Sequence, residues 1–376
     1  MAAALAAGSL SMPAIPAQAS EPLQIVTTIF PEYDWIREIL GDNPAGAEIT
    51  VLLDSGVDLH NYQPTAEDML KIALCDMFVY VGGESDEWAG DILEEIDQED
   101  KVVINLLEAL GEGVREEEIV EGMQADHDHE HNEEHEDGEE DHEEDGHEED
   151  AHEEDDYEEE THEEDEHGED AHEEDEHEEG DGEDAEHDDD HHHEVEYDEH
   201  VWLSLRNAAV LCNAIEEGLE AADPANAAVY EENNRAYQEK LAALDEEYRK
   251  TVDAAGTRTV LFGDRFPFRY LTEDYGLTYY AAFAGCSAET EASFETIVFL
   301  AGKTEELSLP CVLTIEGQDH RIAQTIVDST KTKDQKILTM DSMQATTTKE
   351  AQAGKTYLSI MEDNLSVLRE ALGGNA

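Results

Sequence analysis

The stretch DPANAAVYEENNRAYQEKLAALDEEYRKTVDAAG, residues 223–256, decides the fold. Asp223 and Pro224 suit the cap and the first position of a helix, and no breaker follows before Gly256. A helix of about 30 residues is about 45 Å long, because each residue adds about 1.5 Å. Aromatic and leucine side chains recur along it at mixed helical steps, which predicts one buried face: Tyr230, Tyr237, Leu241, Leu244 and Tyr248. Since too few heptads are present for a coiled coil, the stretch predicts a strut.

Both sides of this helix carry an alternation of strands and helices. On the amino-terminal side we expect strands at 23–29, 48–53, 77–80 and 101–104, with helices at 34–40, 65–73 and 201–221. On the carboxyl-terminal side we expect strands at 259–262, 277–283, 311–314 and 336–339, with helices at 268–275, 294–303, 321–329 and 356–371. Such alternation predicts parallel sheets. The predicted fold class is α/β, with two similar lobes joined by one long helix.

An acidic, histidine-rich tract interrupts the amino-terminal half. Residues 126–199 hold 46 Asp and Glu and 15 His, without Lys or Arg. Histidines recur every five residues from His142 to His177, with Tyr157 in one slot. A segment this polar cannot bury a core, so we expect it to be disordered. Imidazoles and carboxylates suit divalent transition metals, which favours a flexible metal collector over a merely solvating acidic spacer.

The net charge excludes several classes of partner. The formal net charge is −80, and the residues outside the tract still carry −34 of it. Nucleic acids and anionic membrane surfaces require basic patches, so the chain is not expected to bind them. The charge is consistent with attraction of cations, although a halophile-like surface would also explain it.

The first residues resemble a secretory signal peptide. Residues 1–19 carry no charge and end in Ala-Gln-Ala, a typical cleavage site. A disordered alanine-rich tail is the alternative. Because no cysteine lies near this site, we expect an exported protein without a lipid-anchored cysteine.

The four cysteines fit no zinc-finger spacing. Cys75 and Cys212 lie among apolar residues and are expected to be buried thiols. Cys286 and Cys311 lie in the same half, and export permits a disulfide between them. The sequence leaves this pairing open.

Three residues are candidates for metal binding by their position. His60 lies in a turn-rich loop after an expected strand, where parallel sheets build ligand sites. His200 follows the tract, and Asp341 follows the last expected strand. Each has an ordinary alternative, namely a surface histidine, or a turn or cap aspartate.

The motifs around these residues resemble those of the solute-binding proteins of zinc and manganese ABC transporters. Gly56-Val-Asp-Leu-His-Asn-Tyr-Gln-Pro64 is similar to the family loop Gly-Val-Asp-Pro-His-x-Tyr-x-Pro, which supplies the first metal ligand. The run His200-Val-Trp-Leu is similar to the motif of the second ligand, and Asp341 falls on the last. The helix at residues 223–256 resembles the family's interlobe helix. A histidine-rich acidic insertion is typical of the zinc members.

The third ligand departs from the family pattern. The family has His or Glu after the first strand of the second lobe, whereas the two alignments here give Gly263 or Arg265. Asp264 is the nearest carboxylate, and a turn pairing with Arg265 is its alternative role. Three glutamates are reserve candidates: Glu316, Glu289 and Glu291.

The resemblance implies a receptor that captures metal between its lobes and delivers it to the permease of an ABC importer. The implied metal ligands are His60, His200, Asp264 and Asp341. Imidazoles with carboxylates suit zinc first and manganese second. Alternatives are a manganese or iron receptor, a secreted zinc buffer, and a metallohydrolase. Because hydrolase motifs such as His-Glu-x-x-His are absent from the sequence, we expect a monomeric binding protein that is not an enzyme.

These predictions divide the chain into six segments. They are a signal peptide (1–19), an amino-terminal lobe (20–125), the metal-binding tract (126–199), a further helix of the first lobe (200–222), the interlobe helix (223–256) and a carboxyl-terminal lobe (257–376).

Overall fold

The computed structural model describes residues 22–96, 98, 101–124, 196–287, 291–317 and 320–374. The expected signal peptide and most of the acidic tract lie outside these residues. The described chain forms two α/β lobes, each built on a four-stranded parallel sheet.

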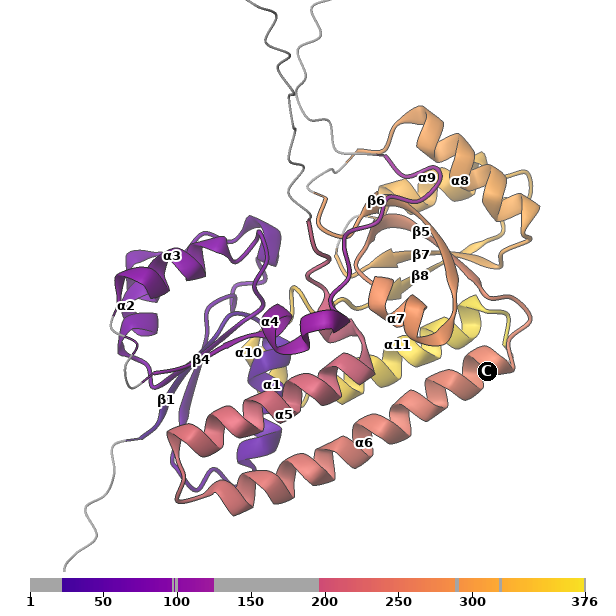
Figure 1. Ribbon diagram of the computed structural model, residues 1–376. Helices are drawn as coiled ribbons and strands as arrows, with labels where there is room; N and C mark the ends of the chain where they lie inside the picture. Colours follow the sequence, from indigo (N-terminus) through magenta and orange to yellow (C-terminus); the bar gives the residue numbers. More distant parts are fainter. Residues whose placement is uncertain are drawn as a thin grey trace, which may run out of the picture. The chain divides into compact units, whose positions relative to one another are not determined.

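The first lobe has the strand order β2-β1-β3-β4. Its strands are β1 (Gln24–Thr27), β2 (Glu48–Val51), β3 (Met77–Tyr80) and β4 (Val102–Asn105). All four residues of β3 are buried, as expected for a central strand covered on both faces. Helices α2 (Ala66–Leu74) and α3 (Glu87–Glu95) pack on one face, whereas α1 (Phe30–Leu40) and α5 (Leu205–Ala222) share the core of the other (Figure 1). The short helix α4 (Leu106–Leu110) follows β4.

The second lobe has the order β6-β5-β7-β8. Its strands are β5 (Thr259–Phe266), β6 (Thr278–Ala284), β7 (Cys311–Ile315) and β8 (Lys336–Met340). Helices α8 (Phe294–Glu306) and α9 (Arg321–Ser329) cover one face, and α7 (Arg269–Tyr275) and α11 (Tyr357–Ala371) share the core of the other. The short α10 (Thr348–Gln352) precedes α11. Because all strands are parallel, the loops after them gather at one edge of each sheet.

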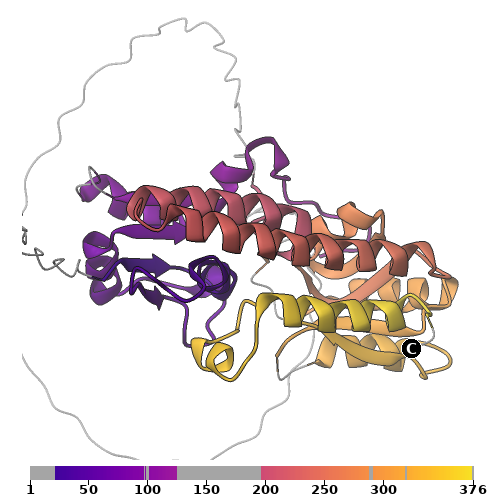
Figure 2. The same cartoon turned by 90° about the horizontal axis from the view of Figure 1, so that it is seen from below.

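The long helix α6 (Ala227–Asp253) runs beside α5 and along both lobes (Figures 1 and 2). Asn233 donates to the carbonyl of Ile39 at 2.9 Å in the first lobe, and Tyr248 donates to that of Met361 at 2.6 Å in the second. The helix begins three residues later than Pro224 predicts. The reason is a turn in which the Asp223 carboxylate accepts from Tyr230 Oη at 2.7 Å and from Asn226 Nδ2.

Strand β5 is longer than the sequence predicts. It continues past Phe262 to Phe266, with an irregularity in its pairing to β6 between Phe262 and Arg265. Asp264 and Arg265 therefore lie within a strand rather than in the loop after it. None of the helices in the described ranges is long and apolar enough to cross a bilayer.

Candidate metal centre

His60 lies on the short 3₁₀ turn Leu59–Asn61 that follows β2. The Asp58 carboxylate caps this turn by accepting from the His60 backbone N–H at 3.1 Å. The imidazole side chain is only 7% exposed. Its Nδ1 lies 2.7 Å from Ser85 Oγ and 3.5 Å from Glu199 Oε2. These contacts orient the ring, and its Nε2 faces His200.

His200 is fully buried at the start of a second 3₁₀ turn, Val201–Leu203. Its Nδ1 lies 3.0 Å from Asp198 Oδ1. This contact orients the ring so that Nε2 lies toward His60. The turn is anchored to the second lobe, since Trp202 Nε1 donates to the Ser342 carbonyl at 2.9 Å.

The two imidazoles face each other. Their Nε2 atoms lie 3.2 Å apart, and their ring centroids 5.1 Å apart. Metal-ligating histidines usually donate the other ring N–H to a carboxylate, a carbonyl or a water, which fixes their orientation. The Asp198 contact to His200 is of this kind, so the pair could serve as two ligands of one cation.

Cys286 completes a group of three side chains. His60, His200 and Cys286 each offer one ligand atom. These three atoms all lie within 4.8 Å of one another. Cys286 follows β6, and its backbone N–H donates to Glu117 Oε1 at 3.0 Å. The preceding residue must be small, because a Cβ on Gly285 would lie 3.0 Å from His200 Cε1 and 3.0 Å from the Phe266 carbonyl oxygen.

Burial governs the electrostatics of this group. Burial and the facing His200 lower the pKa of His60 to about 3, so its imidazole is neutral at physiological pH. Burial, followed by Glu117, raises the pKa of the Cys286 thiol well above its usual value. Burial also raises the pKa of Glu199. The neutral imidazole of His60 therefore has a lone pair available to a divalent cation.

The carboxylates predicted as ligands make other contacts. Asp264 Oδ2 accepts from the Ile315 backbone N–H at 3.3 Å and from Thr314 Oγ1. Asp341 accepts from the Met343 N–H at 2.8 Å and pairs with Lys355 Nζ at 2.9 Å. The structure does not bring either carboxylate into the group of three, and their metal roles stay predictions.

The reserve candidates also lie apart from the group, as far as the structure describes them. Glu316 accepts from the Ser342 N–H and Oγ, both at 2.6 Å, and burial and Asp341 raise its pKa. Glu291 is exposed, and Glu289 lies outside the described residues.

Arg265 crosses between the lobes. Its Nη2 lies 2.5 Å from Asp58 Oδ2, so it pairs with the cap of the His60 turn rather than with Asp264. One amide atom of Gln344 lies 2.6 Å from Asp58, and the other lies 2.8 Å from His200 Nε2. The interlobe contacts thus adjoin the imidazoles.

The pairing of Cys286 with Cys311, which the sequence left open, is not formed, and all four cysteines are free thiols. Cys286 follows the carboxyl end of β6, whereas Cys311 opens β7. Since the sheet is parallel, these positions lie at opposite edges. Sequence reasoning missed Cys286 as a candidate ligand because it considered this residue only for pairing. Like His60, Cys286 lies shortly after a strand, and this position could have indicated it as a candidate ligand.

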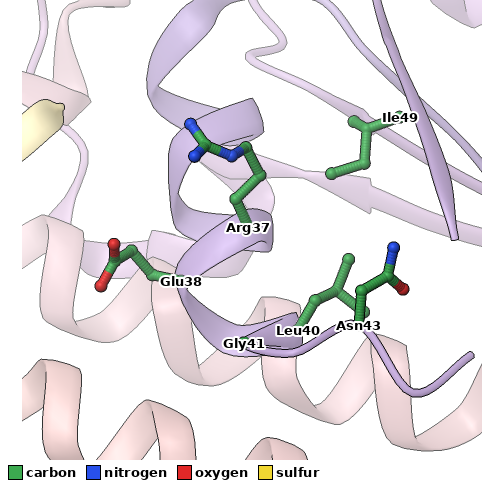
Figure 3. Close-up of a pocket in the computed structure, with 6 residues that line it drawn as sticks. All are labelled: Arg37, Glu38, Leu40, Gly41, Asn43 and Ile49. Carbon is green, nitrogen blue, oxygen red and sulfur yellow. The ribbon is translucent and has the colours of Figure 1, made fainter. Parts of the chain in front are cut away.

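A separate pocket of about 340 Å³ lies at the end of α1 (Figure 3). Its lining contains no imidazole or thiol: Arg37, Glu38, Leu40, Gly41, Asn43 and Ile49. It offers little to a soft divalent metal, so the group at His60 remains the candidate centre.

Comparison with known proteins gives a consistent set of relatives. The sequence profile of the family described as "ZnuA: Zinc-uptake complex component A periplasmic" matches residues 25–371. The zinc-binding lipoprotein AdcA of Streptococcus pneumoniae is 26% identical over 94% of this chain. The chain spans 56% of that relative's length. The high-affinity zinc uptake system protein ZnuA of Bacillus subtilis is 24% identical, over 94% of this chain and 88% of the relative.

Solved structures share the fold. The zinc-bound ZnuA-like domain of Streptococcus pneumoniae AdcA has a TM-score of 0.61 and 22% identity, covering 93% of this chain and 99% of that one. The periplasmic zinc binding protein TroA of Treponema pallidum has a TM-score of 0.63 and 17% identity, with the same coverage. The predicted class, two α/β lobes with parallel sheets, is confirmed.

Proposed function

The chain belongs to the family of periplasmic zinc-uptake components, and we propose that it binds one zinc ion between its lobes and delivers it to the permease of an ABC importer. The observation that carries this proposal is the facing pair of His60 and His200, with Nε2 atoms 3.2 Å apart. Two zinc ligands in a tetrahedral site lie about 3.3 Å apart, given Zn–N distances of about 2.0–2.1 Å. The imidazoles therefore already stand at ligand spacing.

The protein acts by binding rather than by turnover. The site joins residues of both lobes, so bound metal would hold the lobes together and release would require them to part. We place this action outside the cytoplasm, as the cleavage motif at residues 17–19 and the periplasmic family description support. The partner is a membrane permease, and the receptor is expected to act as a monomer.

The acidic tract serves as a metal collector on the same chain. Its described flanks are tied to residues next to the candidate ligands. Before the tract, the Gln124 N–H donates to the Ala282 carbonyl of β6 at 3.0 Å. Near its carboxyl-terminal end, the Glu196 carbonyl accepts from Glu117 N–H at 2.9 Å, and Glu117 Oε1 accepts from the Cys286 N–H. Zinc held by the tract histidines would therefore stay tethered to the receptor.

Deletion of residues 126–196 tests the proposal. The shortened protein should still bind one equivalent of zinc tightly in a competition titration with a chelating dye. Manganese should bind much more weakly than zinc, and manganese binding nearly as tight as zinc binding would favour a manganese receptor. A zinc buffer would lose nearly all binding together with the tract, and that result would overturn the proposal.

A further inference from the structure

We propose that the thiolate of Cys286 is the third protein ligand of the zinc site, a role that rests on the proposed zinc-binding function. The family's usual third position holds Gly263 or Arg265 in this chain. The structure instead brings a cysteine from the loop after the next strand, β6, to the two imidazoles. His60 and His200 stand on loops packed with the first lobe, and Cys286 is the member of the group that the second lobe contributes.

The geometry suits a tetrahedral zinc ion. With Zn–N of about 2.0–2.1 Å and Zn–S of about 2.3 Å, a nitrogen and a sulfur ligand lie about 3.6 Å apart. The ligand atoms of the three residues already lie within 4.8 Å of one another. A shift of about 1 Å would bring the sulfur into the coordination sphere at these bond lengths. Three protein ligands leave one tetrahedral position, for Asp341 or a water.

The surroundings hold the thiol in place. The Cys286 N–H is bound to Glu117, and Gly285 allows the chain to pass against the His200 ring. His60 and His200 each present Nε2 to the same space, because their Nδ1 atoms contact Ser85 and Asp198. Cys286 is thus one of three possible ligands, because two oriented imidazoles lie beside it.

Zinc binding to Cys286 exchanges a proton for the metal ion. Zinc replaces the thiol proton, so one S–H bond breaks, one Zn–S bond forms and the proton passes to solvent. No electron is transferred. A thiolate in place of a carboxylate makes the site softer, which favours zinc over manganese. A thiolate ligand would therefore contribute to selectivity for zinc.

Cobalt(II) spectroscopy on the full chain tests this role, because a thiolate ligand gives cobalt an intense near-ultraviolet charge-transfer band that imidazoles and carboxylates do not give. The acidic tract contains no cysteine, so its cobalt cannot contribute to the band. Wild type should show the band, and Cys286→Ser should lose it. Cys311→Ala is the matched control, since Cys311 is a buried free thiol of the same lobe, and it should keep the band.

Zinc competition titrations complete the test. Cys286→Ser should weaken zinc binding by at least about tenfold, and Cys286→His should restore tight binding without the sulfur band. Circular dichroism establishes that each variant is folded. Tight zinc binding by wild type without a cobalt–sulfur band would overturn the cysteine ligand and leave the receptor function standing. Absence of tight zinc binding in wild type would overturn both.

Discussion

His60 Nε2 and His200 Nε2 lie 3.2 Å apart although 140 residues separate them in the chain. Both residues are buried or nearly so, and each holds its ring by a contact at Nδ1. At this spacing one Nε2 can donate a hydrogen bond to the other. It is also the spacing of two nitrogen ligands on one zinc ion, which makes the pair suited to a shared cation.

Removal of either imidazole should abolish tight zinc binding. Loss of a partner outside the coordination sphere typically costs about 10- to 100-fold in metal affinity, so His60→Ala and His200→Ala should each cost more than this range. His320→Ala is the control, because His320 contacts Thr314 Oγ1 at 3.1 Å and lies outside the group of three. Competition titrations measure the three affinities. An equal loss in the His320 variant would mean that the site has been misplaced.

Zinc binding by the isolated tract, residues 126–196, should be lost on acidification. A histidine ligand must be unprotonated, and the ordinary imidazole pKa is about 6.5. The surrounding carboxylates favour imidazolium and raise this pKa, so release should begin above pH 6.5 as pH falls. Titrations at several pH values measure the affinity. A profile that stays flat between about pH 5 and 8 would identify carboxylates as the tract's ligands.

The two histidine candidates were predictable because each lies in a local motif that fixes both its turn and its neighbours. Cys286 was not, because its closeness to the imidazoles arises only when β6 packs beside the turn at His200. Asp264 was assigned to a loop because the strand was expected to end at Phe262. The continuation of β5 to Phe266 instead directs this carboxylate toward β7.

The ion pair between Asp58 and Arg265 should couple the lobes energetically. The side chains are 20% and 18% exposed, so solvent screens them only partly. Asp58→Asn, Arg265→Gln and the double variant form a double-mutant cycle. Contacting residues typically show interaction free energies of about 0.5–3 kcal/mol, and urea denaturation of the metal-free proteins should give a value within this range. Additive effects of the two substitutions would show that the pair contributes no coupling.

The Arg265→Gln variant should also release zinc faster than wild type. The Arg265–Asp58 pair joins the second lobe to the turn that carries His60, so its loss makes separation of the lobes easier. Stopped-flow chelation measures the dissociation rate. Lys303→Gln, which alters a cation of the same lobe on α8, is the control and should leave the rate unchanged.

Asp34 should make stability depend on pH. It is 1% exposed, accepts from the Tyr357 N–H at 2.8 Å, and burial raises its pKa to about 6. Because this folded pKa exceeds the unfolded value, the protonated form contributes stability that is lost as pH rises from about 4 to 6. Asp34→Asn has no carboxyl group to titrate, so it lacks this loss. The free energy of unfolding of this variant, relative to that of wild type, should rise by about 2–3 kcal/mol between pH 4 and 8.

Urea denaturation with a chelator present measures this difference. Asp42→Asn, at an exposed position just after the same helix, corrects for the loss of one negative charge. A difference between Asp34→Asn and wild type that did not change with pH would mean that Asp34 stays ionised on folding over this range.

Substitutions of Asp264 distinguish two sets of zinc ligands. One is the set that the family resemblance implies, which includes Asp264, and the other has Cys286 as the third ligand. Its carboxylate accepts from Ile315 N–H, Thr314 Oγ1 and Arg265 N–H, so Asp264→Ala leaves partly buried donors without their acceptor. Such losses cost about 1–3 kcal/mol of stability, and zinc affinity should stay close to wild type. Asp264→Asn, which keeps an acceptor oxygen, should lose less stability.

The comparison is made in the protein lacking residues 126–196, so that only the interlobe site is titrated. If Asp264 does bind the metal, both Asp264→Ala and Asp264→Asn should weaken zinc strongly. Asp264→His should then retain zinc and increase its preference over manganese, because imidazole suits zinc whereas carboxylate also suits manganese. A large affinity loss with unchanged stability would return Asp264 to the ligand set. Lower stability with unchanged zinc affinity would show that the carboxylate instead holds β5 against β7.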